Sequence, residues 1–192
     1  MSMRQFYHSV FAALWLVWLI YWAVASTATK RTVRLESVGS RLGHTLPLLL
    51  AGWLMAVPQI GIPLLEERFI PWSPIIFWSA AALTAVGLLF SVWARVHLGG
   101  NWSGTVTVKE EHALITTGPY ALVRHPIYTG ILTGFLGSAL ALGQWRGVLA
   151  LVIGIAGLWR KWRLEERWMQ ETFGEVYSTY KKRVRAVIPY VL

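Results

Sequence analysis

Long apolar stretches alternate with shorter polar ones along this chain. A helix that crosses a bilayer needs about 20 consecutive, mainly apolar residues, and five stretches approach or reach that length. The predicted membrane-spanning helices are residues 6–28, 46–65, 72–95, 127–143 and 145–161. We therefore expect an all-α, polytopic membrane protein in which residues 1–192 form a single integral membrane domain. A composition with 55% apolar and only 14% charged residues agrees with this class.

The first predicted span contains no charged side chain and ends before Lys30 and Arg31. It could instead be a signal peptide, because Ala23, Val24 and Ala25 resemble a cleavage site. Three Trp and Tyr21 lie within it, and such amphipathic rings are typical of the boundary between hydrocarbon and water. The aromatic residues and the basic stop favour a retained span.

The second apolar stretch contains several prolines, and the fourth and fifth stretches are almost continuous. Pro47, Pro58 and Pro63 interrupt residues 46–65, so we expect this helix to be kinked or broken. Only a short polar break at Gln144 separates the fourth and fifth stretches, which predicts a tight antiparallel helical hairpin.

Two polar segments lie outside the predicted spans. Residues 96–126 are expected to form a loop, whereas residues 162–192 keep a helical rhythm of apolar positions and are expected to form C-terminal helices. Gly174 is expected to end the first of these helices, with a second short helix from Glu175 to Arg183. Because consecutive spans alternate in direction, both segments fall on the same side of the membrane, where they can meet.

Positive charge is concentrated on the side of these two segments. The chain has 18 Lys and Arg against nine acidic residues, all of them Glu, and a net charge of +9. If the five spans alternate, only Arg4, Arg68 and Arg146 fall on the opposite side. Cytoplasmic loops of membrane proteins are enriched in Lys and Arg, so we expect the N-terminus outside and the C-terminus in the cytoplasm, in an inner (cytoplasmic) membrane. Contacts with anionic membrane lipids account for the charge without a nucleic-acid partner.

The composition excludes several kinds of chemistry. Without Cys there are no disulfide bonds, thiolate zinc sites or cysteine nucleophiles, and without Asp there is no Ser-His-Asp triad. No pair of His has the spacing of metal ligands, since a loop separates His112 from His125. We therefore expect no metal site.

The first polar segment ends in Arg124, His125 and Pro126. Proline favours the first position of a helix, so it predicts that the fourth helix begins there and leaves Arg124 and His125 beside free backbone N–H groups, which attract anions. Alternatively, both side chains are interfacial and extend toward lipid phosphates. The sequence alone leaves both interpretations open.

The second polar segment contains paired carboxylates in an aromatic stripe. On a helix, Trp162, Met169 and Phe173 share one face, and Glu165 and Glu166 fall between them. The glutamates could pair with neighbouring Lys and Arg side chains in an ordinary salt-bridged helix face, which the residues alone favour. Periodicity does not choose between the two glutamates.

These two segments together carry a known pattern. The run H-x-L-I-x-x-G-x-Y-x-x-x-R-H-P-x-Y-x-G begins at His112, and the paired glutamates and then F-G-E-x-Y-x-x-Y-K-K-R-V from Phe173 follow it. The combination resembles the isoprenylcysteine carboxyl methyltransferase family, and residues 98–103 are similar to a stretch of its prokaryotic members. The resemblance covers about half of the chain. It implies an integral membrane enzyme that uses S-adenosylmethionine, held between the loop and the C-terminal helices on the cytoplasmic side.

The resemblance also implies roles for individual residues. A basic residue one turn before the first glutamate would meet the acceptor's carboxylate; here it is Lys161, where family members usually carry Arg. Glu165 and Arg124 are the expected catalytic residues, with Arg124 helping to align the acceptor. The implied cofactor contacts are His112, Ala113, Leu114, Ile115, Tyr120, His125, Pro126, Ile127, Tyr128 and Glu165.

The implied reaction suits these residues. A carboxylate with an ordinary pKa near ~4 is already ionised at neutral pH, so methyl transfer from a sulfonium to it needs no general base. We expect a lipophilic methyl acceptor that enters from the bilayer and is methylated at the boundary between membrane and cytoplasm. The alternatives are a membrane reductase of related architecture that uses NADPH and a non-catalytic membrane protein.

Overall fold

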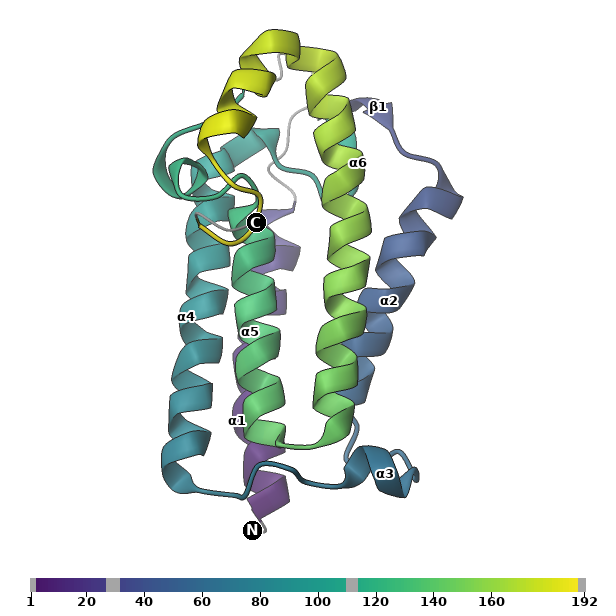
Figure 1. Ribbon diagram of the computed structural model, residues 1–192, viewed down its shortest axis with the longest axis vertical. Helices are drawn as coiled ribbons and strands as arrows, with labels where there is room; N and C mark the ends of the chain where they lie inside the picture. Colours follow the sequence, from purple (N-terminus) through teal and green to yellow (C-terminus); the bar gives the residue numbers. More distant parts are fainter. Residues whose placement is uncertain (1–2, 27–31, 110–113, 190–192) are drawn as a thin grey trace.

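The computed structural model describes residues 3–26, 32–109 and 114–189. Within these residues, five long helices run alternately between the two ends of an elongated bundle, and shorter elements lie in the connections (Figure 1). The long helices are α1 (Met3–Ala25), α2 (Val38–Ala56), α4 (Pro74–Leu98), α5 (Pro126–Leu142) and α6 (Trp145–Arg183). The short elements are strand β1 (Thr32–Leu35), helix α3 (Pro63–Glu66), 3₁₀ turn η1 (Gly99–Asn101), strand β2 (Thr107–Lys109) and 3₁₀ turn η2 (Gly118–Ala121).

The two ends of the bundle differ in what they carry. The N-terminus, α3 and the turn between α5 and α6 lie at one end (Figure 1). The connection from α4 to α5, strand β1 and the C-terminal part of α6 lie at the other. The two polar segments of the sequence are therefore side by side at one end of the bundle.

The fold is mostly helical, as predicted, but two details of the prediction are wrong. The second helix is Val38–Ala56 rather than 46–65, because Ser37 caps its start by accepting a hydrogen bond from Ser40 N at 3.2 Å. Pro47 lies inside this helix, whereas the helix ends before Pro58 and α3 begins at Pro63, so the stretch is broken, as predicted. The segment 96–126 is not an irregular loop throughout, since β2 pairs antiparallel with β1 and satisfies the backbone groups of both segments.

The last helix bends where the sequence predicts a stop. Gly174 has φ 52° and ψ −124°, a backbone conformation that glycine adopts without steric cost. The residues after it turn back over the end of the bundle (Figure 1). This bend returns Tyr177 and Tyr180 toward the connection between α4 and α5.

Small residues allow α4 and α5 to approach closely. A Cβ atom added at Gly87 of α4 would lie 2.6 Å from the carbonyl oxygen of Gly130 on α5, and one added at Gly137 would lie 2.6 Å from the carbonyl oxygen of Ala80. Glycine, alanine and serine at such positions let membrane helices pack backbone to backbone. The α4–α5 pair is therefore the closely packed centre of the bundle.

Helix α1 is attached to this pair by two indole groups. Trp15 Nε1 donates to Ser138 Oγ at 3.0 Å, and Trp18 Nε1 donates to Ser91 Oγ at 2.7 Å. These two Trp lie in the middle of α1, so they serve as hydrogen-bond donors between helices rather than as anchors at the membrane boundary.

The outer surfaces of the helices are suited to lipid. Within the described residues, two helices are long and apolar enough to cross a membrane, in windows that begin at His8 and at Pro74. Only 6% of the first window and 39% of the second are buried. The central helix of a soluble protein is mostly buried, whereas here large apolar side chains such as Val17, Ile75 and Leu89 are more than half exposed.

Arg146 occupies a buried position at the opposite end of the bundle from the polar segments. Its guanidinium donates to the carbonyl oxygens of Leu54 at 3.3 Å and Val57 at 2.5 Å, at the C-terminus of α2. The side chain is 1% exposed. A cation at a helix C-terminus stabilises the unpaired carbonyls there, which accounts for a buried arginine at the start of α6.

The close approach of α4 and α5 predicts the effect of a single methyl group. Gly130→Ala places a Cβ 2.7 Å from Ser91 Cβ, and the helices must separate, which costs about 2 kcal/mol of unfolding free energy. Gly52→Ala is the matched control, because a Cβ there meets no atom within 4 Å. Thermal unfolding in detergent micelles should show a lower midpoint for Gly130→Ala alone, and equal midpoints would contradict this packing.

Candidate active site

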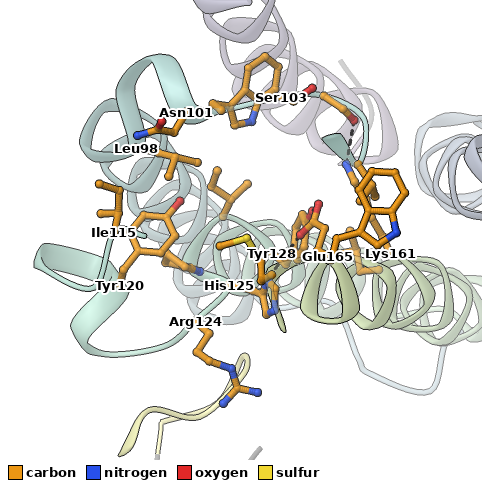
Figure 2. Close-up of a pocket in the computed structure, with 18 of the residues that line it drawn as sticks. Leu98, Asn101, Ser103, Ile115, Tyr120, Arg124, His125, Tyr128, Lys161 and Glu165 are labelled. Atoms are coloured by element: carbon orange, nitrogen blue, oxygen red, sulfur yellow. Dashed lines mark hydrogen bonds and ion pairs between the residues drawn. The ribbon is translucent and has the colours of Figure 1, made fainter. Parts of the chain in front are cut away.

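A cavity of about 340 Å³ lies at the end of the bundle where the two polar segments meet. Its size is within the roughly 300–1,000 Å³ of small-molecule sites. Helices α1, α2, α5 and α6 and the connection between α4 and α5 all contribute to its walls. Figure 2 shows Glu165 and Lys161 on one side of the cavity, with Leu98, Ile115 and Tyr120 on another.

Glu165 presents its carboxylate to this cavity. Tyr128 OH donates to Glu165 Oε1 at 2.5 Å, and His125 Nδ1 lies 3.6 Å from Oε2. Pro126 begins α5, so Tyr128 lies in its first turn, where it faces α6. The Glu165 side chain is 24% exposed. Its carboxylate is thus oriented by α5 while one edge remains accessible from the cavity.

Glu166 faces a different direction, because consecutive residues on a helix are rotated by about 100°. Its carboxylate is buried and accepts hydrogen bonds from Arg124 Nε at 2.9 Å and pairs with Lys181 Nζ at 3.0 Å and His125 Nε2 at 3.4 Å. Burial alone would raise the pKa of Glu166, but the hydrogen bonds from His125 and Arg124 outweigh it and hold the pKa well below its usual range. The structure therefore separates the two glutamates, which periodicity could not.

Arg124 joins the start of α5 to the C-terminal segment. Its guanidinium donates to both Glu166 and the carbonyl oxygen of Val184, and its side chain is 7% exposed. Arg124 N also donates to the Arg185 carbonyl at 2.8 Å. Arg124 contributes to the cavity wall, but its guanidinium points away from the cavity (Figure 2). The catalytic role of aligning an acceptor stays a prediction for Arg124, whose guanidinium is used in these contacts in the structure.

Lys161 lies one turn before Glu165 on the same wall. Its Nζ donates to the carbonyl oxygen of Gly104 at 2.9 Å and lies 5.5 Å from the centroid of the Tyr128 ring. An ammonium has three N–H donors, so the bond to Gly104 leaves others for a ligand. A cation and a carboxylate thus line the cavity one helical turn apart.

Tyrosines close the cavity beneath the bent end of α6. Tyr180 OH donates to the backbone carbonyl of Tyr120 at 2.5 Å. Burial raises the pKa of Tyr120 and of Tyr177 well above the usual range and raises the pKa of Tyr180 to about 12. All three phenols are neutral at physiological pH, and they add aromatic surface without adding charge.

Most residues implied by the sequence resemblance lie around this cavity. Leu114, Ile115, Tyr120, Arg124, His125, Pro126, Ile127, Tyr128, Lys161 and Glu165 all contribute to its walls. His112 and Ala113 lie outside the described residues.

The structure adds lining residues that sequence reasoning did not select. Trp22 of α1 and Leu48 of α2 contribute apolar surface, and nothing in a plain apolar span distinguishes them from their neighbours. Asn101 and Trp102 also line the cavity, and the similarity of residues 98–103 to prokaryotic family members was the available signal. The Asn101 Oδ1 atom is buried and has no hydrogen-bond partner among the described residues.

The sequence matches a known class of methyltransferases. The sequence model of the phospholipid methyltransferase family matches residues 75–176, more than half of the chain. A protein-S-isoprenylcysteine O-methyltransferase of Schizosaccharomyces pombe is 33% identical over 119 residues, which are 59% of this chain and 49% of the relative. Protein-S-isoprenylcysteine O-methyltransferase B of Arabidopsis thaliana is 31% identical over 135 residues, which are 66% of this chain and 67% of the relative.

A solved structure agrees in fold. The eukaryotic intramembrane Ras methyltransferase, an isoprenylcysteine carboxyl methyltransferase, superposes with a TM-score of 0.53 at 22% identity, over 80% of this chain and 50% of that one. Within the phospholipid methyltransferase class, this chain belongs to the isoprenylcysteine O-methyltransferase family. It spans about half the length of several curated relatives that it matches.

The buried position of Glu166 predicts a loss of stability that depends on pH. Glu166→Gln leaves the Arg124 guanidinium without a counter-charge, which costs about 3 kcal/mol at pH 7. The folded-state pKa of Glu166 lies below its unfolded value of about 4.3. Its stabilising contribution is therefore complete above that value, declines below it and disappears only as the pH falls through the folded-state pKa, so the difference between wild type and variant should begin to narrow below about pH 4.

Chemical unfolding in detergent between pH 7 and pH 3 measures this narrowing. Glu171→Gln is the control, since Glu171 forms an exposed pair with Arg34 at 2.7 Å and should change stability by less than about 1 kcal/mol. A difference between wild type and Glu166→Gln that stays constant down to pH 3 would contradict the assignment.

Proposed function

We propose that this chain is an integral membrane methyltransferase that uses S-adenosylmethionine to methylate the carboxylate of a lipophilic acceptor. The observation that carries the proposal is the cavity in which an accessible carboxylate, Glu165, and an ammonium, Lys161, lie one turn apart. Trp22, Leu48 and Leu158 supply an apolar floor on the side of the membrane helices. One cavity thus offers both polar and apolar surface.

The residues present fit S-adenosylmethionine. Glu165 would accept hydrogen bonds from its ammonium group, and the aromatic surfaces of Tyr120 and Tyr128 would pack on adenosine and attract the sulfonium. The unpartnered Asn101 Oδ1 can accept a hydrogen bond from an amine such as that of adenine. When bound, the cofactor supplies an activated methyl group on sulfur. We extend the same role to His112 and Ala113, which the family resemblance includes among its contacts.

The acceptor would bind between Lys161 and the apolar floor. Lys161 would meet its carboxylate as a single point charge, since a lysine cannot form the two parallel hydrogen bonds that an arginine forms. The relatives are named for protein-S-isoprenylcysteine, which joins a carboxylate to a long apolar chain. That combination matches the two kinds of surface in this cavity, and such a molecule can enter laterally from the bilayer.

The chain's own groups are sufficient for carboxyl methylation. The acceptor is already ionised at neutral pH, so no side chain has to remove a proton. The required contributions are to hold donor and acceptor in line and to exclude water. The tyrosines under the bent end of α6 and the apolar floor supply the exclusion, and Lys161 and Glu165 supply the alignment.

A five-span topology completes the proposal. Helices α1, α2, α4, α5 and the first half of α6 would cross the membrane, with the N-terminus outside and the site at the cytoplasmic face. The excess of Lys and Arg at the end that carries the site supports this orientation.

Cofactor binding is the direct test of the function. The midpoint of thermal unfolding in detergent should rise with S-adenosylmethionine and with its demethylated product but not with NADPH. Glu165→Gln should weaken binding by about 1–3 kcal/mol in calorimetry, because a hydrogen bond to a charged group is lost. Glu171→Gln, the same substitution at an exposed position two turns later, should bind as wild type does.

Other results would reject the proposal. Stabilisation by NADPH alone would indicate a membrane reductase, and stabilisation by none of the three ligands would indicate a non-catalytic membrane protein. Equal affinity of Glu165→Gln and wild type would remove Glu165 from the cofactor site.

The absence of native Cys makes the topology testable by labelling single introduced thiols. Ile62→Cys lies before α3, and Lys182→Cys lies in the last turn of α6; both positions are exposed. With a membrane-impermeant maleimide, the thiol of the Ile62→Cys variant should react in intact cells, and that of the Lys182→Cys variant only after permeabilisation. Reaction of both variants from one side would show an even number of spans between the two positions and contradict the arrangement.

A further inference from the structure

Glu36 is a buried carboxylate that the proposed reaction does not use. It follows β1 directly and is 4% exposed. His44 on α2 is 2% exposed, and its Nε2 lies 3.5 Å from Glu36 Oε1. Both residues precede residues 75–176, the part matched by the family model. Their role is therefore not one that the family match assigns.

Glu36 holds one end of the segment that forms a cavity wall. Glu36 N donates to the Val106 carbonyl at 3.1 Å, and Val106 N donates to Glu36 Oε1 at 3.0 Å. These bonds extend the β1–β2 pairing by one step beyond Leu35 and Thr107. Residues 101–106, which we name the strap, all line the cavity. Both backbone polar groups of the strap's last residue are thus bonded to Glu36.

The other attachment of the strap is Lys161. Its Nζ donates to the carbonyl oxygen of Gly104, two residues from Val106. Glu36 and Lys161 therefore hold the same short piece of backbone. A change in the position of Val106 would move the oxygen that orients the Lys161 ammonium.

Helices α2 and α6 fix the relative positions of these attachments. A Cβ at Gly157 of α6 would lie 3.3 Å from the His44 carbonyl oxygen, and one at Gly43 would meet the Arg160 guanidinium. His44 also interacts electrostatically with Lys161 and Glu165. The start of α2 is therefore packed on α6 at the turn that precedes Lys161.

Stability alone does not account for a carboxylate at this position. Glu36 Oε2 has no hydrogen-bond partner among the residues that the structure describes. Burying such a group without a partner is unfavourable, and an apolar residue could extend the strand pairing through its backbone. The features that the Glu36 side chain adds are the bond from Val106 N and the contact with His44 Nε2, and of these only the bond from Val106 N holds the strap.

We infer that Glu36 is a positioning residue for methyl transfer: through Val106 and the strap it holds the Gly104 carbonyl, which orients Lys161 toward the acceptor's carboxylate. This inference rests on the proposed function. It predicts a larger change in the use of the acceptor than in the binding of the cofactor. Glu165, Tyr128 and His125 have no bond to the strap, and Asn101, its one residue proposed to meet the cofactor, is five residues from Val106, whereas Gly104 is two residues from it.

The kinetic test uses the full chain in detergent with N-acetyl-S-farnesylcysteine as the acceptor probe. Glu36→Ala should raise the KM for this probe about ten-fold and change the Kd for S-adenosylmethionine by less than two-fold. Glu36→Gln should remain close to wild type, because its amide oxygen can still accept from Val106 N. Glu67→Ala, at an exposed site at the other end of the bundle, should have no effect.

A double-mutant cycle separates positioning from a general structural effect. If Glu36 acts through Lys161, Glu36→Ala should have no further effect on KM in a Lys161→Met background. Equal effects in both backgrounds would overturn the inference, as would a Glu36→Gln variant as impaired as Glu36→Ala.

Two measurements test the strap without activity. In Glu36→Ala, hydrogen exchange at Val106 N–H and acylation of Lys161 by an amine reagent should both be at least five-fold faster than in wild type and in Glu36→Gln. Unchanged rates in Glu36→Ala would overturn the inference. Failure of wild type to bind S-adenosylmethionine would instead reject the proposed function, and these two rates would still decide whether Glu36 holds the strap.

Discussion

The buried ion pair between Arg124 and Glu166 determines how the functional end of the molecule is built. It ties the start of α5 to α6, and the Arg124 contacts with Val184 and Arg185 bring the C-terminal segment to the same point. A buried pair of this kind is strongly destabilising to break, since either partner left alone is an unpaired charge. With Glu166 and Arg124 used in this way, Glu165 and Lys161 are the charged groups of α6 left to face the cavity.

The cavity takes its character from its position at the end of the bundle. Within hydrocarbon, backbone polar groups must be bonded inside the protein, which favours uninterrupted helices. Turns, strands and charged side chains collect where the helices end, and here they meet apolar side chains from α1, α2 and α6. A site at that boundary can combine an ionic group for a cofactor or a carboxylate with an apolar surface for a lipid chain.

Residues that precede the region matched by the family model also form part of the cavity wall. Residues 75–176 match the family model, yet Trp22 and Leu48 form part of the cavity floor and Glu36 holds the strap. Under the proposed function, the matched region would supply the groups for methyl transfer, and the preceding helices would shape part of the space for the acceptor.

The sequence by itself determined the helices and their polar ends, because those depend on local patterns: apolar length, Pro126 at a helix start and Gly174 at a bend. Most of the residues that its motif selected line the cavity. Local patterns could not set the bounds of α2, pair β1 with β2, or turn Arg124 away from the cavity. The family resemblance had selected Glu165, but the partners of Glu165 and Glu166, and the contributions of Trp22, Leu48 and Glu36, depend on which distant residues meet. Only packing in three dimensions decided them, since a side chain's role follows from the partners that burial gives it.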